Sequence, residues 1–269
     1  MHELVLLNSE LVQARDALLP AVSSGAQNGK GVFTTIAIYG GKPFLWEMHW
    51  RRLAEHSLKL GIDLGDFGAD VTRQRLDELL VSNSVNNGRA RITFVDGSPS
   101  KLWPVESDQG TNLVITTANL RPKPAQLRLC LSPYRINSAS PLAGVKSCSY
   151  LDKILALEHA RLRNFEEAVQ LNERGEIASA CMANIFWRKG GRLFTASLAT
   201  GCLAGTTREF LLGKMECEQV EVGIEELRDA DRIFLTSAGV GVLTVDEFEG
   251  RRLAGSGDPI LELIPGRDQ

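Results

Sequence analysis

The sequence predicts an α+β protein of two domains. Strand-like and helix-like segments are mixed throughout the chain, without internal repeats or low-complexity stretches. With 269 residues, of which 43% are hydrophobic, the chain can bury a large core and falls in the range of one or two domains. Residues 118–125 (ANLRPKPA) hold two prolines and few apolar side chains, which is typical of a linker. We therefore expect a small α+β domain at 1–118, a linker at 119–125 and a larger domain at 126–269.

The first half of the chain is expected to form strands and two helices. Residues 4–7 and 31–39 are rich in β-branched and aromatic side chains, and the glycines at 40 and 41 favour a hairpin turn after the second run. Apolar residues recur at helical spacing in 47–60 and near 71–81, which predicts two amphipathic helices. Strands near 89–95 and 112–117 complete this half.

The second half is expected to mix short strands with two helices. The pattern predicts strands at 127–131, several between 167 and 195, and two near 232–236 and 241–245, with helices at 150–163 and 206–217. The helix at 150–163 has one apolar face, and such a face normally packs on the core. Its members are Leu151, Ile154, Leu155 and Leu162.

Composition and charge favour a small-molecule ligand. Thirty basic against 33 acidic residues give a formal charge of −3, which is too balanced for a nucleic-acid or anionic-membrane surface. The five cysteines are scattered and include no C-x-x-C pair, so we expect reduced thiols in a cytoplasmic protein. No apolar run approaches the roughly 20 residues that span a bilayer. No metal site is expected, because His49 and His56 lack cysteine or carboxylate partners at metal-ligand spacing.

Lys146 is the lysine whose surroundings best suit a chemical role. It lies among small residues in PLAGVKSCSYLDKILALEHA (141–160), immediately before the expected helix. A lysine held in an apolar pocket can act as an amine nucleophile toward a carbonyl. Composition does not separate it from the other lysines, because most lysines are solvated surface charges.

Four segments resemble the class-IV aminotransferase family of pyridoxal-phosphate enzymes. The lysine segment is similar to the family's Gly-x-Lys motif, and residues 171–195 are similar to its signature strand pair. GCLAGTTREFL (201–211) resembles its phosphate loop, and residues 28–62 resemble its N-terminal hairpin and helix. The resemblance covers nearly the whole chain. It implies PLP fold type IV, with a small α/β N-terminal domain and a larger, cofactor-anchoring pseudo-barrel C-terminal domain.

The resemblance assigns cofactor-binding roles to residues of three segments. Lys146 would hold pyridoxal 5′-phosphate covalently and, once released, remove the α-proton of the substrate as a general base. Gly205, Thr206 and Thr207 open a helix, where backbone N–H groups and hydroxyls suit a phosphate. The two threonines would otherwise be a simple N-cap.

Two further residues match cofactor contacts of the family. Arg52 corresponds to the arginine that reaches the phosphate, where a bidentate donor suits a dianion. Its neighbour Arg51 should lie in solvent, because adjacent helical residues face different directions. Tyr150 is either a hydrogen-bond partner of the cofactor's phenolic oxygen or a core tyrosine.

One position departs from the family pattern. The family places a glutamate five residues before the Asn of its Asn-Ile/Leu-Phe segment, where it keeps the pyridine nitrogen protonated; counting back from Asn184 gives Ser179. Glu176, three residues away along the strand, should point to the opposite face. A hydroxyl cannot hold a proton on that nitrogen as a carboxylate does, so the cofactor becomes a weaker electron sink. The chain is then either a lyase that eliminates at the β-carbon or a homologue with little activity.

Within the family, the chain is most similar to the aminodeoxychorismate lyases, which eliminate pyruvate from 4-amino-4-deoxychorismate to leave 4-aminobenzoate for folate synthesis. The similarity rests on residues 33–35 (FTT) and 183–190 (ANIFWRKG). It makes Thr35 a candidate contact near the reacting centre, although a β-branched strand residue would look the same.

The loop at 235–240 is closer to the branched-chain and D-amino-acid transaminases, which remain the alternative. In that loop, the candidate substrate contacts are Thr236, Ser237 and Ala238. The resemblance also implies a homodimer.

Overall fold

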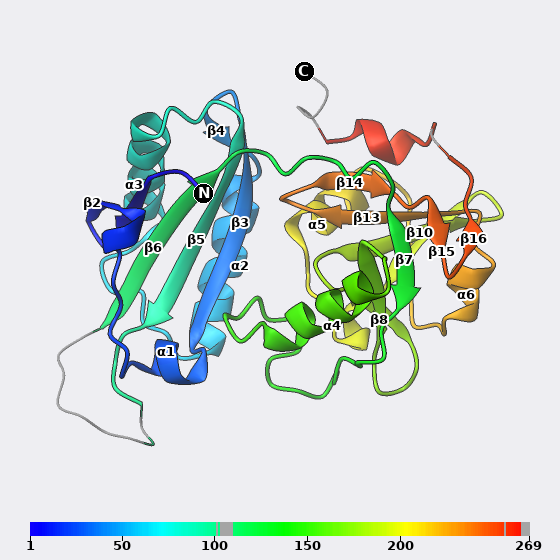
Figure 1. Ribbon diagram of the computed structural model, residues 1–269, viewed down its shortest axis with the longest axis horizontal. Helices are drawn as coiled ribbons and strands as arrows, with labels where there is room; N and C mark the ends of the chain where they lie inside the picture. Colours follow the sequence, from blue (N-terminus) through cyan, green and yellow to red (C-terminus); the bar gives the residue numbers. More distant parts are fainter. Residues whose placement is uncertain (101, 103–109, 256, 265–269) are drawn as a thin grey trace. The chain divides into compact units, whose positions relative to one another are not determined.

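The structure, a computed structural model, describes residues 1–100, 102, 110–255 and 257–264, and its contacts divide the chain into two units (Figure 1). The first unit comprises Met1–Arg121 and Val145–Ser149, and the second unit comprises Pro122–Gly144 and Tyr150–Gln269. The sequence analysis assigned Val145–Ser149 to the second domain, whereas its contacts group it with the first unit. The linker at 119–125 stays a prediction. The α+β class is confirmed by β-sheets and helices in both units.

An antiparallel sheet with helices forms the first unit. Its strands follow the order β2-β1-β6-β5-β3-β4, and the hairpin expected at 40–41 joins β3 to β4. The sheet comprises β1 (Leu4–Leu7), β2 (Glu10–Gln13), β3 (Gly31–Tyr39), β4 (Lys42–Pro43), β5 (Gly88–Asp96) and β6 (Thr111–Ala118). The helices are α1 (Ser24–Asn28), α2 (Trp46–Lys59) and α3 (Ala69–Ser82).

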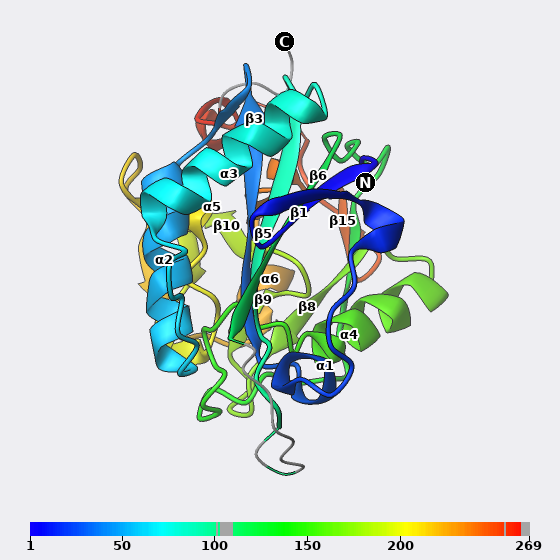
Figure 2. The ribbon, with the colours of Figure 1, turned by 90° about the vertical axis from the view of Figure 1, so that its left-hand side faces the viewer.

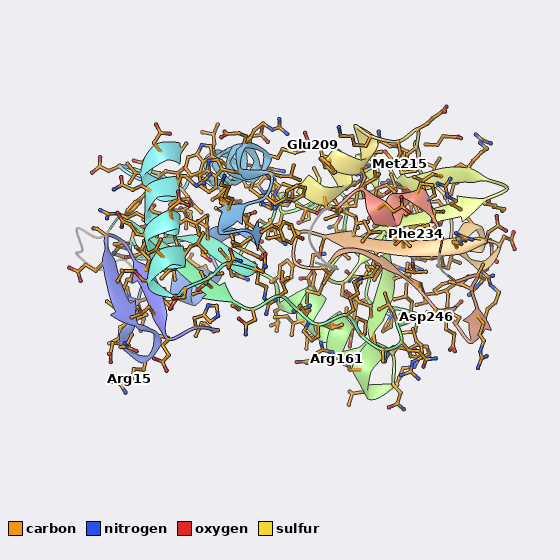
Figure 3. The ribbon with its side chains drawn as sticks, turned by 90° about the horizontal axis from the view of Figure 1, so that it is seen from above. Arg15, Arg161, Glu209, Met215, Phe234 and Asp246 are labelled. Carbon is orange, nitrogen blue, oxygen red and sulfur yellow. The ribbon has the colours of Figure 1, made fainter. Side chains whose placement is uncertain are left out.

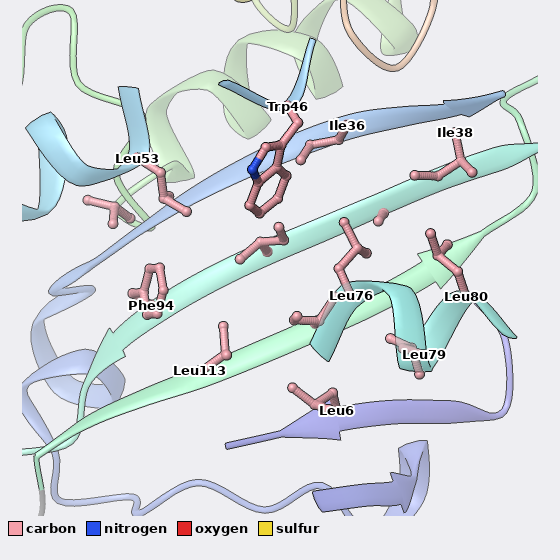
Figure 4. Close-up of a cluster of buried hydrophobic side chains, with 14 of the residues drawn as sticks. Leu6, Ile36, Ile38, Trp46, Leu53, Leu76, Leu79, Leu80, Phe94 and Leu113 are labelled. Atoms are coloured by element: carbon pink, nitrogen blue, oxygen red, sulfur yellow. The ribbon is translucent and has the colours of Figure 1, made fainter. Parts of the chain in front are cut away.

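Helices α2 and α3 cover one face of this sheet (Figure 2). Side chains alternate between the two faces of a strand, so Ile36 of β3 and Phe94 of β5 point to the helices. There they pack with Leu53 of α2 and Leu76 of α3, all of them nearly or fully buried (Figure 4). The opposite face of the sheet therefore carries the alternate residues, among which the candidate site is found.

Two sheets form the second unit, with strand orders β12-β11-β10-β13-β14 and β16-β15-β7-β8-β9. The strands are β7 (Arg128–Leu131), β8 (Glu167–Leu171), β9 (Ile177–Ala180), β10 (Asn184–Lys189), β11 (Arg192–Ala196), β12 (Glu218–Val220), β13 (Arg232–Ser237), β14 (Gly241–Thr244), β15 (Glu247–Phe248) and β16 (Arg251–Arg252). The helices are α4 (Leu151–Leu162), α5 (Thr206–Leu212) and α6 (Glu225–Arg228).

Apolar residues from both sheets share one core in the second unit. Val169 of β8 and Trp187 of β10 belong to the same buried cluster. Phe234 of β13 points to a separate cluster with Leu211 of α5 and Met215 (Figure 3). Strands β10 and β13 are thus packed on both faces.

One expectation for the helices of the second unit was wrong. Helix α5 ends at Leu212 rather than near 217, because Gly213, a poor helix former, takes the C-cap position. In α4, the apolar face is largely exposed in the single chain: Leu151 is 65% exposed and Leu162 86%. The small residues Ala156 and Ala160 are buried instead, because they let the helix lie close against the strands.

Among the residues that the structure describes, no helix is long and apolar enough to span a membrane.

Candidate functional site

Lys146 lies in a short extended segment that runs beside the start of β3. The backbone N–H of Phe33 donates to the carbonyl oxygen of Lys146 at 3.0 Å, and that of Cys148 donates to the carbonyl oxygen of Gly31 at 2.8 Å. Gly31 permits this approach, because a Cβ there would lie 2.9 Å from the sulfur of Cys148. The backbone of the candidate catalytic lysine is therefore fixed to the sheet.

The side chain of Lys146 lies over an aromatic ring that a second cation also contacts. Its Nζ is 4.4 Å from the centroid of the Phe33 ring, and the guanidinium carbon of Arg91 is 3.5 Å from the same centroid. Cations are attracted to the face of an aromatic ring. Lys146 is half-buried, so its amine is held near apolar surface beside another positive charge.

Helix α2 supplies a neutral histidine to the lysine segment. The backbone N–H of Lys146 donates to Nδ1 of His56 at 3.1 Å, which requires this nitrogen to be unprotonated. Burial lowers the pKa of His56 to about 4, with further lowering by the charges of Arg52, Lys59 and Lys146. His56 is therefore neutral near pH 7 and accepts the hydrogen bond that positions the lysine backbone.

Arg52 is buried in a hydrogen-bonded group with strand β3. Its guanidinium donates to Oγ1 of Thr34 at 2.9 Å, and this hydroxyl lies 2.7 Å from Nδ1 of His49. Burial, followed by the charges of Arg52 and Lys146, lowers the pKa of His49 well below its usual value. Neutral His49 is hydrogen-bonded to the Thr34 hydroxyl through Nδ1, so Arg52 is fixed through a side chain on the helix-covered face. Arg51 is exposed, as expected.

Thr35 lies on the other face of β3 from Thr34. Phe33 is two residues away on the same strand, and Arg91 of β5 is paired directly with Thr35, so the three side chains share one face of the sheet. Sequence reasoning missed Arg91. The signal was present in β5, where Arg89, Arg91 and Thr93 alternate with three buried apolar residues.

In the second unit, Gly205 takes the N-cap position of α5, and Thr206 and Thr207 are both buried in its first turn. A Cβ at Gly205 would lie 2.0 Å from Oδ1 of Asn184 in β10. The side-chain amide of Asn184 donates to the carbonyl oxygen of Leu203 at 2.8 Å. Asn184 thus attaches the loop before α5 to the sheet. Glycine is needed at position 205, because the loop passes close to the Asn184 side chain there.

Thr236 lies directly opposite Asn184, in the neighbouring strand β13. Its hydroxyl oxygen is buried and has no hydrogen-bond partner within the described part of the chain. Ser237 ends β13 and pairs with Gly241, and the N–H of Val240 donates to the carbonyl of Ser237 at 3.2 Å. Ala238 therefore lies in a tight turn beside a hydroxyl that is free to bind a ligand.

Ser179 lies in β9 and is 6% exposed. Glu176 precedes the strand, and its carboxylate accepts hydrogen bonds at 2.7 Å from the amide of Asn172 and the guanidinium of Arg174. The Arg174 hydrogen bond is the largest influence that lowers the pKa of Glu176. The Glu176 carboxylate is therefore ionised and already hydrogen-bonded within its own turn.

Tyr150 takes the N-cap position of α4 and is half-buried, with the Nζ of Lys153 5.9 Å from its ring centroid. In the first unit, the Lys146 amine thus lies over Phe33, on the face of β3 that also carries Thr35, whereas Arg52 is bound to Thr34 on the helix-covered face. In the second unit the structure brings Gly205, Thr206 and Thr207 close to Thr236 through Asn184. The role of Tyr150 stays a prediction.

Comparison with known proteins identifies relatives of several activities. A sequence model of the amino-transferase class IV family matches residues 31–248. The chain is 27% identical over 255 residues to an aminodeoxychorismate lyase from Bacillus subtilis, covering 91% of this chain and 87% of the relative. It is 26% identical over 271 aligned residues to a D-alanine aminotransferase from Listeria innocua, covering 97% and 93%.

A solved structure has the same fold. The crystal structure of a putative 4-amino-4-deoxychorismate lyase from Legionella pneumophila superposes with a TM-score of 0.84 at 25% identity, covering 91% of this chain and 92% of the other.

Proposed function

Because the chain belongs to the class-IV aminotransferase family, a family of pyridoxal-phosphate enzymes, we propose that it is a lyase that eliminates pyruvate from 4-amino-4-deoxychorismate and leaves 4-aminobenzoate for folate synthesis. The observation that carries this proposal is Ser179, which has no carboxylate at the position of the family's glutamate. Elimination tolerates a weaker electron sink, because the departing group takes up the charge. The lyase from Bacillus subtilis supports the same choice.

The cofactor is pyridoxal 5′-phosphate, and the residues present fit it. The buried hydroxyl of Thr236 lacks a partner among the described residues, as a donor reserved for a ligand would. Gly205 adds no side chain of its own at the N-cap of α5, where the side chain of Asn184 approaches its backbone. Gly205, Thr206, Thr207 and Thr236 would bind the phosphate, together with Arg52. Lys146 would hold the aldehyde carbon, Tyr150 the phenolic oxygen and Ser179 the ring nitrogen.

Lys146 performs the proton transfer in this proposal. Bound pyridoxal phosphate withdraws electrons from the ring carbon that carries the substrate's amino group. The Nζ of Lys146 then takes the proton from that carbon. Hydrogen bonds with His56 and Phe33 hold the Lys146 backbone in place for this step. The C–O bond at the neighbouring ring carbon breaks, the ring becomes aromatic, and the enol of pyruvate leaves and is protonated to pyruvate. Arg91, beside the amine, suits a substrate that carries carboxylates.

The decisive experiment is turnover of 4-amino-4-deoxychorismate by the pure, cofactor-loaded protein. We expect equal amounts of pyruvate and 4-aminobenzoate without any 2-oxo acid. Lys146→Ala should abolish both products, and its spectrum should lack the absorbance of a covalently bound cofactor. Arg51→Ala, which changes an exposed neighbour of Arg52, serves as a control with normal turnover.

A transaminase is the second candidate. It is favoured by the Thr236-Ser237-Ala238 loop and by the D-alanine aminotransferase from Listeria innocua. Turnover that needs an acceptor 2-oxo acid would replace the lyase proposal with this one. A protein that binds the cofactor but turns over neither kind of substrate would be a homologue of low activity.

We further propose that the chain acts as a homodimer in the cytoplasm. The support is helix α4, on which Leu151, Leu155 and Leu162 are exposed in the single chain. Exposed apolar patches commonly mark interaction surfaces.

A further inference from the structure

Gln170 stands directly opposite Ser179 in the second unit. It lies in β8, which pairs antiparallel with β9, and the register aligns the two residues. Directly opposed residues of an antiparallel pair point to the same face. Gln170 is 1% exposed, so an uncharged amide lies beside the serine in a buried position.

The two side chains lie on the face of the strands that α4 covers. Ala168 and Cys181 lie two residues from Gln170 and Ser179 and therefore point to the same face. They pack with Ala156 and Ala160 of α4. Val169, on the opposite face of β8, belongs to the core between the two sheets. The positions Ala168, Cys181 and Cys130 on this side are apolar or thiols, whereas Ser132, which follows β7 beside Gln170, is polar and buried.

The carbonyl oxygen of the Gln170 side chain, Oε1, is buried and has no hydrogen-bond partner among the described residues. The hydroxyl of Ser179 also makes no hydrogen bond with the described residues, but Ser179 is 6% exposed and its oxygen is not one of the fully buried, unpaired atoms. Buried polar groups are almost always paired, because an unpaired one loses its hydration without compensation. The buried Gln170 carbonyl oxygen, which has no partner among the described residues, and the neighbouring Ser179 hydroxyl therefore point to a polar ligand atom near both.

We infer that Gln170 is a second contact to the ring nitrogen of the cofactor, acting together with Ser179. This inference rests on the proposed function, which assigns the Ser179 position to that nitrogen. A carbonyl oxygen only accepts, and a protonated ring nitrogen donates. Gln170 therefore stabilises the protonated form that a hydroxyl does not hold by itself. Its neutral amide does so less strongly than the family's carboxylate would.

The direct test measures ring-nitrogen protonation rather than turnover. The full-length protein is loaded with cofactor labelled with ¹⁵N in the ring, and the ¹⁵N chemical shift is recorded for the unchanged protein, Gln170→Leu and Gln170→Glu. We expect Gln170→Leu to move the shift toward the unprotonated value, and Gln170→Glu to move it toward the protonated value. Loss of one hydrogen bond to a charged donor should also weaken cofactor binding roughly tenfold in Gln170→Leu.

A purely structural role would give a different result. In that case Gln170→Leu would raise thermal stability equally with and without cofactor, because it removes an unpaired buried amide. On our inference, the rise in Tm that cofactor produces becomes smaller in Gln170→Leu. Val169→Ala is the matched control: it changes the next residue on the opposite face, and it should lower stability while the ¹⁵N shift stays in place.

The failures of the two proposals are distinguishable. An unchanged ¹⁵N shift and unchanged cofactor affinity in Gln170→Leu would overturn the role of Gln170 and leave the proposed function standing. Failure of the unchanged protein to bind pyridoxal phosphate would overturn both.

Discussion

At the scale of single residues, the unusual feature is that hydroxyl and amide groups take a place normally held by a charge. Ser179 and Gln170 are both uncharged and buried, and Glu176 is bound within its own turn. If these two residues face the ring nitrogen as we propose, a proton on a bound ring is held by hydrogen bonds to them rather than by an ion pair with them.

Ser179→Glu should increase transaminase activity. The new carboxylate would hold a proton on the ring nitrogen, and transamination depends on this stronger electron sink. Initial rates with D-alanine and with branched-chain amino acids, each with a 2-oxo acid acceptor, measure the change, for which we expect at least a tenfold rise. Ser179→Gln is the control of similar size. If both variants behave alike, the charge at this position is not what limits transamination.

The two histidines of α2 should make the fold sensitive to acid. The pKa of His56 is lowered to about 4, against an ordinary value of 6.5, so the unfolded chain binds a proton at a higher pH than the folded protein does. Its contribution to stability is therefore complete above about pH 6.5 and is lost as the pH falls toward 4.

Urea unfolding at a series of pH values measures this effect, and His56→Gln should flatten the profile, since glutamine still accepts from the N–H of Lys146. The pKa of His49 is also lowered, so the His56→Gln variant should keep part of the dependence of stability on pH. Identical profiles for both proteins would contradict the assignment.

At the scale of elements, the strands were easier to predict than the helix surfaces. The alternation in β3 and β5 fixes which residues face α2 and α3, so both strands could be located to within about a residue. The register between strands could not be predicted, because it depends on partners far away in sequence. Arg91 and Gln170 were missed for this reason, because the role proposed for each depends on the residue directly opposite it in the neighbouring strand.

Helix α4 shows a second limit of sequence reasoning. Its leucines form an apolar stripe, but the stripe is exposed in the single chain and the alanines are buried. Periodicity indicates that a helix has an apolar face, and it does not identify what covers that face.

The loop before α5 should not tolerate a side chain at Gly205. In Gly205→Ala, the new methyl group would lie 2.0 Å from Oδ1 of Asn184, whose amide is already bound to Leu203. We expect a loss of about 1–3 kcal/mol in the free energy of unfolding, as for other overpacked sites.

Gly213→Ala is the matched control. A Cβ at Gly213 meets its nearest atom at 3.5 Å, and its φ of −77° suits alanine. This variant should be neutral or gain about 0.4–1 kcal/mol. Equal effects at the two glycines in chemical denaturation would show that the contact with Asn184 is unimportant.

At the scale of the whole molecule, the exposed face of α4 predicts self-association. Leu155 is 45% exposed, and Leu155→Lys should weaken the proposed dimer, because it places a charge in an apolar interface. Light scattering across a dilution series measures the effect. Val81→Lys, at a 79% exposed position of α3, is the control with unchanged mass. A monomeric parent protein with full activity would refute the dimer.

The two-domain α+β fold could be predicted because its motifs are local in sequence, whereas the contacts of Lys146 could not be predicted. Its partners Phe33, His56 and Arg91 come from three separate elements of the first unit. The segment Val145–Ser149 looked like part of the second domain because it is continuous with α4 in sequence.

That segment also affects how the protein can be made and divided. Since residues 145–149 belong with residues 1–121, the polypeptide leaves the first unit, enters the second, returns and leaves again. A single cut near residue 121 would separate the edge of β3 from the strand-like stretch that hydrogen-bonds to it. During synthesis, the first unit cannot complete its backbone hydrogen bonds until residue 149 has emerged from the ribosome. By then residues 122–144 of the second unit have also emerged, before the rest of that unit has been made.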